Sequence, residues 1–181
     1  MTIALDLAQR LIAISSFRDD QPHEGAVVDF LEDYFRHHLP WLELERQPTG
    51  TPGRDNLIAF TDRHPRLLLG GHLDTVPISS ADQLIPTIRD GSLYGLGAVD
   101  MKSGLATVIA TAQQHGPGGS YAILCYVDEE FDFAGMRTFI ASSWNTIRPE
   151  LICIAEPTDL SILAGCRGLI EFRLRVFGQR G

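Results

Sequence analysis

The sequence predicts an α/β fold, with a mostly parallel central sheet flanked by helices. Two observations carry this prediction. Short apolar runs alternate with helical patterns between residues 56 and 155, as in "NLIAF", "RLLLGG", "SYAILCYV" and "LICIA". Before them, apolar residues recur at helical spacing in "LDLAQRLIAI" and "EGAVVDFLEDYF". Buried strands that alternate with helices are typical of a sheet whose strands run mostly parallel.

The expected elements follow one another along the chain. The apolar face of an early helix is marked by Val27, by Phe30 or Leu31, and by Tyr34 and Phe35. A turn rich in proline and glycine leads to a strand at 56–60. We then expect strands near 67–71, 120–127 and 151–155, with helices at 101–115 and through "AGMRTFIASS". From 169 to 177 apolar and charged residues alternate, which predicts an antiparallel strand with one solvated face.

Composition excludes several classes of partner. The 181 residues carry 15 basic and 23 acidic side chains, a formal net charge of -8, so binding to nucleic acid or to anionic membranes is not expected. No apolar run reaches the roughly 18 residues of a membrane span. Cys125, Cys153 and Cys166 lie in apolar runs without a CxxC pair, which predicts buried thiols and a cytoplasmic location.

Imidazole and carboxyl groups stand where the expected strands end. His72 and Asp74 follow "RLLLGG", residues 128–130 follow "AILCYV", and Glu156 follows "LICIA". Asp100 lies between a glycine-rich loop and a helix. Because ligands collect at the carboxyl ends of strands in open α/β sheets, we expect these groups to converge there.

Carboxylates at short range raise one another's pKa, and a divalent metal ion removes that cost. Imidazole with carboxylate oxygen suits zinc, and also manganese or cobalt, and a pair of ions needs a bridging carboxylate. Asp100 is placed for such a bridge. Asp74, two residues beyond His72 and on the same side of a strand, is placed to accept the second ring N–H of the histidine.

Each group also has a simpler interpretation when taken alone. His72 could be a turn histidine, Asp100 a helix N-cap, and residues 128–130 a solvated helix start. Glu156 could be a loop residue. Four such groups at one edge of the sheet favour a shared site. A serine hydrolase is not supported because G-x-S-x-G is absent, and "GLG" does not extend to the G-x-G-x-x-G of a nucleotide-binding domain.

Four motifs in order, "GGHLDTVP", "LYGLGAVDMKSG", "VDEEFDFAG" and "AEPT", resemble the M20 family of co-catalytic zinc metallopeptidases and aminoacylases. This family includes acetylornithine deacetylases, succinyl-diaminopimelate desuccinylases and glutamate carboxypeptidases. The resemblance implies a zinc-peptidase-like catalytic domain and hydrolysis of the amide bond of an N-acyl amino acid or small peptide. A zinc-activated water would be the nucleophile.

The resemblance also assigns roles to individual residues. It implies two zinc ions, with His72 as a ligand of one ion and Asp100 as the bridge between them. Glu130 would bind one zinc and Glu156 the other. Glu129 would be the general base and Asp74 would orient His72. The peptide bond between Asp100 and Met101 would be cis.

The chain also departs from the family pattern. Ser103 stands where the family usually has glycine, and no histidine after Glu156 matches the family's late zinc ligand. We therefore expect residues 1–166 to be the N-terminal part of the catalytic domain and 167–181 a crossover strand into a lid and dimerisation domain, so that the parent would be a homodimer. The chain alone could be inactive, and the alternative function is an inactive metal-binding or regulatory module.

Overall fold

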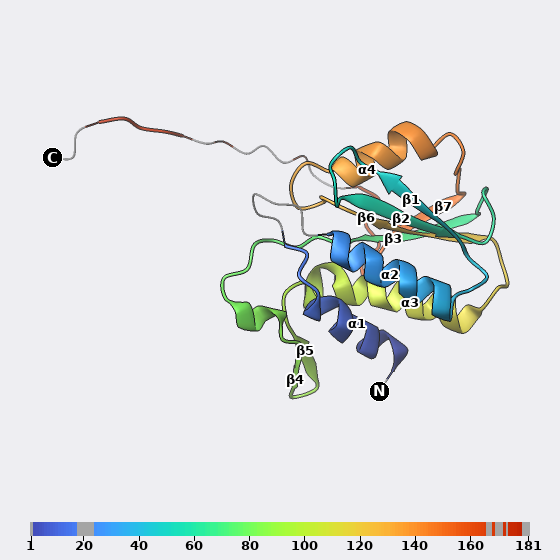
Figure 1. The fold of residues 1–181 in the computed structure, drawn as a ribbon, viewed down its shortest axis with the longest axis horizontal. Coiled ribbons are helices and arrows are strands. Elements are labelled where there is room, and N and C mark those ends of the chain that lie inside the picture. Colours follow the sequence, from blue (N-terminus) through green and yellow to red (C-terminus); the bar gives the residue numbers. More distant parts are fainter. Residues whose placement is uncertain (1, 18–23, 166–167, 169–171, 173, 179–181) are drawn as a thin grey trace.

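The protein forms a five-stranded sheet between two layers of helices (Figure 1). A computed structural model describes residues 2–17, 24–165, 168, 172 and 174–178. The strand order is β1-β2-β6-β3-β7. The strands are β1 (Glu43–Pro48), β2 (Asp55–Phe60), β3 (Leu67–His72), β6 (Tyr121–Tyr126) and β7 (Leu151–Ile154).

The predicted α/β class is confirmed, and the sheet is mixed. β3 pairs in parallel with β6 and with β7, whereas β2 pairs antiparallel with β1 and with β6. The short turn between β1 and β2 explains their antiparallel pairing, because a parallel neighbour needs a longer crossover. The sequence analysis did not anticipate β1. The parallel half, β6-β3-β7, is the part that carries the candidate site.

Helices cover the two faces of the sheet unequally. Figure 1 shows α1 (Ile3–Ala13), α2 (Gly25–His38) and α3 (Ser103–His115) on one face, and α4 (Ala134–Thr138), continued by η3 (Phe139–Ser143), on the other. The central strand β6 is buried along its whole length. Ile123 and Cys125 pack into the cluster with α1, α2 and α3, while Leu124 packs with Phe139 of η3. The alternation follows from the period of two along a strand.

The predicted helices and central strands are confirmed with shifted ends. The helix expected from Met101 begins at Ser103 instead, after an irregular turn η2 (Ala98–Lys102) in which Asp100 and Met101 have non-helical dihedral angles. Asp100 is therefore not the N-cap of α3. A short helix η1 (Ala81–Leu84) and the hairpin of β4 (Thr87–Arg89) and β5 (Ser92–Tyr94) were not foreseen; the hairpin stands beside α1 and away from the main sheet (Figure 1).

Strand β7 differs from the buried strand that its apolar letters predict. It lies at the end of the strand order, and Leu151, Ile152 and Cys153 are exposed. The reason is that the described residues place β3 on one side of β7 and no strand on the other. Cys125 is a buried free thiol as predicted, Cys153 is free and exposed, and Cys166 lies outside the described residues.

The strand expected at 169–177 lies partly outside the described residues. Those within it that are described, Phe172 and 174–177, belong to no strand, and their apolar side chains are exposed. None of the described helices combines the length and the apolar character that a membrane crossing requires.

Candidate metal centre

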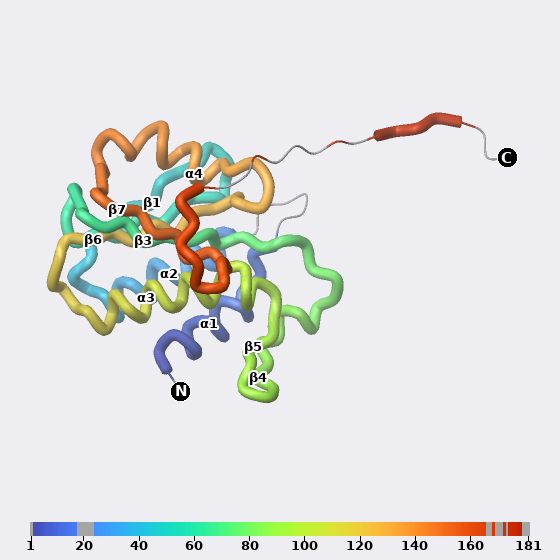
Figure 2. The backbone as a smooth tube through the Cα atoms, turned by 180° about the vertical axis from the view of Figure 1, so that it is seen from behind, coloured from blue at the N-terminus to red at the C-terminus, as the bar shows by residue number. Residues whose placement is uncertain are grey.

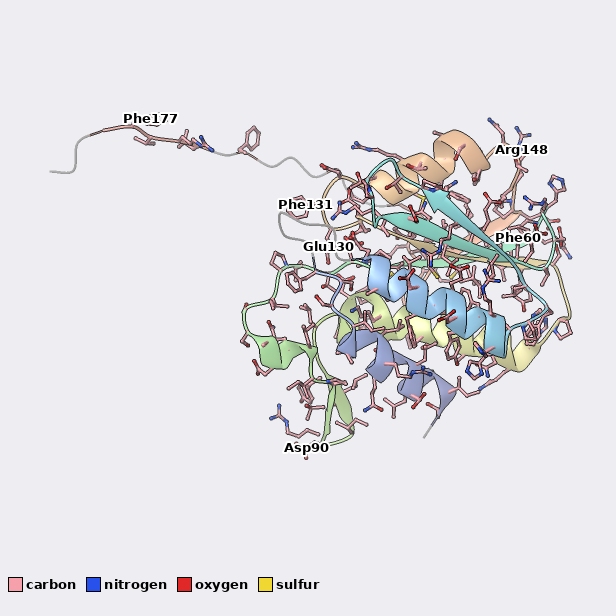
Figure 3. The ribbon with its side chains drawn as sticks, in the orientation of Figure 1. Phe60, Asp90, Glu130, Phe131, Arg148 and Phe177 are labelled. Carbon is pink, nitrogen blue, oxygen red and sulfur yellow. The ribbon has the colours of Figure 1, made fainter. Side chains whose placement is uncertain are left out.

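The carboxyl ends of the three parallel strands meet at one edge of the sheet. His72 at the end of β3 is in register with Tyr126 at the end of β6, and Gly70 is in register with Ile154 of β7. Figure 3 shows Glu130 at this edge, whereas Phe60, the last residue of the antiparallel strand β2, lies at the opposite one. The structure thus brings together all six residues that the sequence selected: His72, Asp74, Asp100, Glu129, Glu130 and Glu156.

His72 is the buried centre of this group. Its side chain is 1% exposed, and its Nδ1 lies 2.9 Å from the main-chain oxygen of Asp74. A carbonyl oxygen can only accept, so Nδ1 carries a proton and donates it. Nε2 points the other way, 2.9 Å from Asp100 Oδ1 and 4.0 Å from Glu156 Oε2. The fixed tautomer leaves Nε2 as the metal-binding atom.

The Asp74 carboxylate binds main-chain amides. It accepts hydrogen bonds from the backbone N–H groups of Glu129 and Glu130, each at 3.0 Å, and its Oδ1 lies 3.7 Å from Nδ1 of His72. The sequence led us to expect that this carboxylate would take the imidazole N–H. Instead the main-chain oxygen of Asp74 takes it, and the side chain ties the turn after β6 to the end of β3.

Asp100 is presented by the turn η2. Its side chain is 53% exposed, and the peptide bond to Met101 is cis, as the family resemblance implied. Met101 is fully buried, and its sulfur accepts the backbone N–H of His72 at 3.2 Å. A Cβ on Gly71 would come within 2.5 Å of the Met101 methyl group, so a glycine in the strand allows this close approach.

Glu156 is positioned by the contact between β7 and α3. The N–H of Ala155 donates to Gly70 O at 3.0 Å, which extends the pairing with β3 beyond the strand. A Cβ on Gly104 would lie 2.2 Å from Ala155 O, so only a glycine fits at this point of α3. Figure 2 shows the segment after β7 passing close to the beginning of α3.

A buried ion-pair network supports the turn that carries Glu129, and the sequence analysis missed it. Asp128 has a φ of 62° and is 1% exposed. Its carboxylate pairs with Arg54 at 2.6 Å and accepts the N–H of Ala134 at 3.2 Å. Arg54 also lies 3.2 Å from Glu24, at the beginning of α2. Arg54 joins three distant segments directly behind the site.

The charges in the site shift one another's pKa. Burial lowers the pKa of His72, but the hydrogen bond that its ring donates to Asp100 and the charges of nearby carboxylates outweigh burial and raise the pKa to about 9. Burial raises the pKa of Glu129, Glu130 and Glu156 above the ordinary value; the charge of His72 opposes this shift and the neighbouring carboxylates add to it. The hydrogen bond with His72 lowers the pKa of Asp100. The site concentrates negative charge that a cation would neutralise.

The donor set fits a divalent metal ion. The ligand atoms of His72, Asp100 and Glu156 lie within 4.8 Å of one another, and so do those of His72, Glu129 and Glu130. One imidazole nitrogen with carboxylate oxygens is a combination that zinc accepts. The fold and the site together define a class of protein. It is an α/β domain with a candidate metal centre at the carboxyl ends of its parallel strands.

Comparison with known proteins identifies the family. Residues 68–167, more than half of the chain, match the model of peptidase family M20/M25/M40, and the chain belongs to this family. All four motifs lie within the matched region.

Curated relatives are about one third identical to the chain over the aligned residues. It is 36% identical to acetylornithine deacetylase from Photorhabdus laumondii, over 98% of this chain and 48% of the relative. It is 33% identical to succinyl-diaminopimelate desuccinylase from Corynebacterium glutamicum, over 96% and 47%. The chain therefore spans about half the length of these relatives.

Solved structures support the fold. An M20 family metallo-carboxypeptidase from Sulfolobus solfataricus superposes with a TM-score of 0.66 at 14% identity, over 86% of this chain and 37% of that one. Human carnosine dipeptidase 1 gives 0.62 at 16% identity, over 83% and 37%. At these identities the likeness is one of fold.

Proposed function

We propose that the protein containing this chain hydrolyses the amide bond of an N-acyl amino acid or small peptide with the help of two zinc ions, with cobalt or manganese as possible substitutes. The observation that carries the proposal is the position of Glu129. Its carboxyl group belongs to the same cluster as His72 and Glu130, and its backbone is held by Asp74. A free carboxylate beside metal ligands is what a general base requires.

The residues of the site would divide the work between binding and proton transfer. His72 and Glu156 would hold one ion, Glu130 the other, and Asp100 would bridge them. Bound zinc would polarise the amide carbonyl and lower the pKa of water towards about 7. Glu129 would accept the proton from the attacking water and return it to the leaving amine. The raised pKa of Glu129 brings its proton affinity nearer to neutral pH, where a general base works best.

The substrate class rests on relatives. Their names describe an acetylornithine deacetylase, a succinyl-diaminopimelate desuccinylase and a carnosine dipeptidase, all of which act on small acylated amino acids or peptides. From the family resemblance we also propose a homodimer in which residues 167–181 lead to a lid and dimerisation domain, and from the cysteine usage a cytoplasmic location.

Replacing Asp100 by alanine should abolish metal binding, because both proposed ions lose a ligand. Elemental analysis of the purified chain would count zinc per molecule, with Asp33→Ala, an exposed carboxylate on α2, as the matched control. A metal content lost in Asp100→Ala and kept in Asp33→Ala supports the site. Zinc, manganese and cobalt all absent from the folded unsubstituted chain would contradict it.

Zinc affinity should increase with pH between about 6 and 8. The pKa of His72 is about 9 in the metal-free protein, so the ring is protonated in this range and zinc must displace a proton. One displaced proton changes the affinity about tenfold per pH unit. Zinc titrations at several pH values would measure the slope, and an affinity independent of pH would show that His72 is not a ligand.

A further inference from the structure

The support of Asp100 comes from the two residues that follow it. The half-exposed carboxylate of Asp100 has His72 as its hydrogen-bond partner, which a bound metal would replace. The backbone beside it is held more firmly. Met101 is buried under β3 and contacts His72, and the backbone N–H of Lys102 donates to Gly97 O at 2.9 Å. The position of Asp100 therefore depends on how Met101 and Lys102 are anchored.

Lys102 is a buried lysine with an unusual pair of partners. Its side chain is 2% exposed, and Nζ donates to the main-chain oxygens of Leu11 and Ile14, each at 2.9 Å. Among the described residues no carboxylate forms an ion pair with it. The two oxygens belong to the C-terminal end of α1, which ends at Ala13 with Ile14 as its C-cap. The main-chain oxygens at the C-terminal end of a helix carry a partial negative charge, which stabilises the side-chain nitrogen of Lys102.

The same contact connects three parts of the site. Lys102 lies two residues after Asp100, and its stem packs beneath Gly97, whose φ of 74° begins the turn. On the other side, the segment after α1 reaches the strand end that carries His72, because Thr75 N–H donates to Ser16 O at 3.2 Å. The end of α1 is thus attached both to the turn with Asp100 and to the segment beyond His72.

We propose that Lys102 is a positioning residue, which fixes Asp100 for metal binding by fastening the turn η2 to the C-terminal end of α1. The inference rests on the metal site proposed above. A buried ammonium group is costly to desolvate, and an apolar side chain would fill the same space at lower cost. Stability alone therefore gives little reason for a lysine here, whereas a directional anchor next to the bridging ligand does.

The test compares Lys102→Met with a variant that weakens the same helix elsewhere. Methionine keeps most of the stem and removes the ammonium group. Leu7→Ala, in the buried face of α1, removes packing without touching Lys102 or its partners. Zn²⁺ affinity would be measured by competition with a chelator, the Co²⁺ absorption spectrum would report ligand geometry, and thermal unfolding of the metal-free protein would report stability.

The expected result is a separation of the two effects. Lys102→Met should weaken Zn²⁺ binding about 10- to 100-fold, as loss of a group that orients a ligand does, and should change the Co²⁺ spectrum. Leu7→Ala should lower the unfolding temperature and leave both metal readouts unchanged. An affinity within about twofold of the unsubstituted protein in Lys102→Met, or equal losses in both variants, would overturn the inference.

Two further variants keep the outcome decisive. If Lys102→Met does not fold, Lys102→Gln retains a shorter donor and should give a smaller loss of affinity in the same direction; unchanged affinity there overturns the inference. Asp100→Ala separates the two proposals. Metal lost in Asp100→Ala but kept in Lys102→Met refutes the role of Lys102 alone, whereas metal kept in Asp100→Ala refutes the site itself.

Discussion

Replacing Glu129 by glutamine should lower kcat for amide hydrolysis by about 10²- to 10⁴-fold and leave the metal content unchanged. Glutamine has the same size and keeps the backbone N–H that donates to Asp74, so the turn after β6 is preserved. What it loses is the ability to accept a proton from water and pass it to the leaving amine. Steady-state hydrolysis of N-acetyl amino acids by the complete, zinc-loaded protein would measure the effect.

Glu150→Gln is the matched control for this experiment. Glu150 lies just before β7 at the opposite edge of the sheet, where its exposed carboxylate pairs with Arg66. It should change neither kcat nor metal content. A kcat for Glu129→Gln close to that of the control would assign the proton transfer to another group. Zinc lost in Glu129→Gln would instead make Glu129 a ligand and contradict its role as a base. A complete protein that binds zinc but hydrolyses none of these substrates would favour the regulatory alternative.

The fold could be predicted from the sequence where the signal was local. The strands β3, β6 and β7 are short apolar runs, and their order with α3 and α4 gives the parallel half of the sheet. The sequence analysis did not predict β1, because "ELERQP" is mostly polar and forms a strand by pairing with β2. The apolar residues of β7 predicted a buried strand, which is wrong, because the local sequence does not show that the strand lies at the end of the strand order.

In the site, too, local features could be predicted from the sequence and long-range contacts could not. His72, Asp100, Glu130 and Glu156 stand directly at strand ends or loop ends, so their types and positions were sufficient to select them. Main-chain partners leave no mark in a sequence, which is why the oxygen of Asp74 that binds His72 was not foreseen. Long-range partners are hidden as well. Lys102 is separated from Leu11 by 91 residues, and Arg54 from Asp128 by 74.

Replacing Arg54 by methionine should reduce the free energy of unfolding by about 3–5 kcal/mol. Arg54 is 6% exposed, and its two partners Glu24 and Asp128 are each 1% exposed. Without the guanidinium group both buried carboxylates lose their ion pair with Arg54, which is costly in a buried region. Urea unfolding of the metal-free protein would measure the loss.

The comparison with Arg46 isolates the contribution of burial. Arg46 also pairs with two carboxylates, Asp29 and Glu32, but its side chain is 34% exposed, so Arg46→Met should cost at most about 1 kcal/mol. Adding Glu24→Gln and Asp128→Asn to Arg54→Met should restore part of the lost stability, because the stranded charges are then removed. Equal losses for the two arginines would mean that the network behind Glu129 contributes no more than a surface ion pair. A larger loss for Arg54, relieved by neutralising its partners, would show that the turn bearing Glu129 is held from behind by a buried charge network.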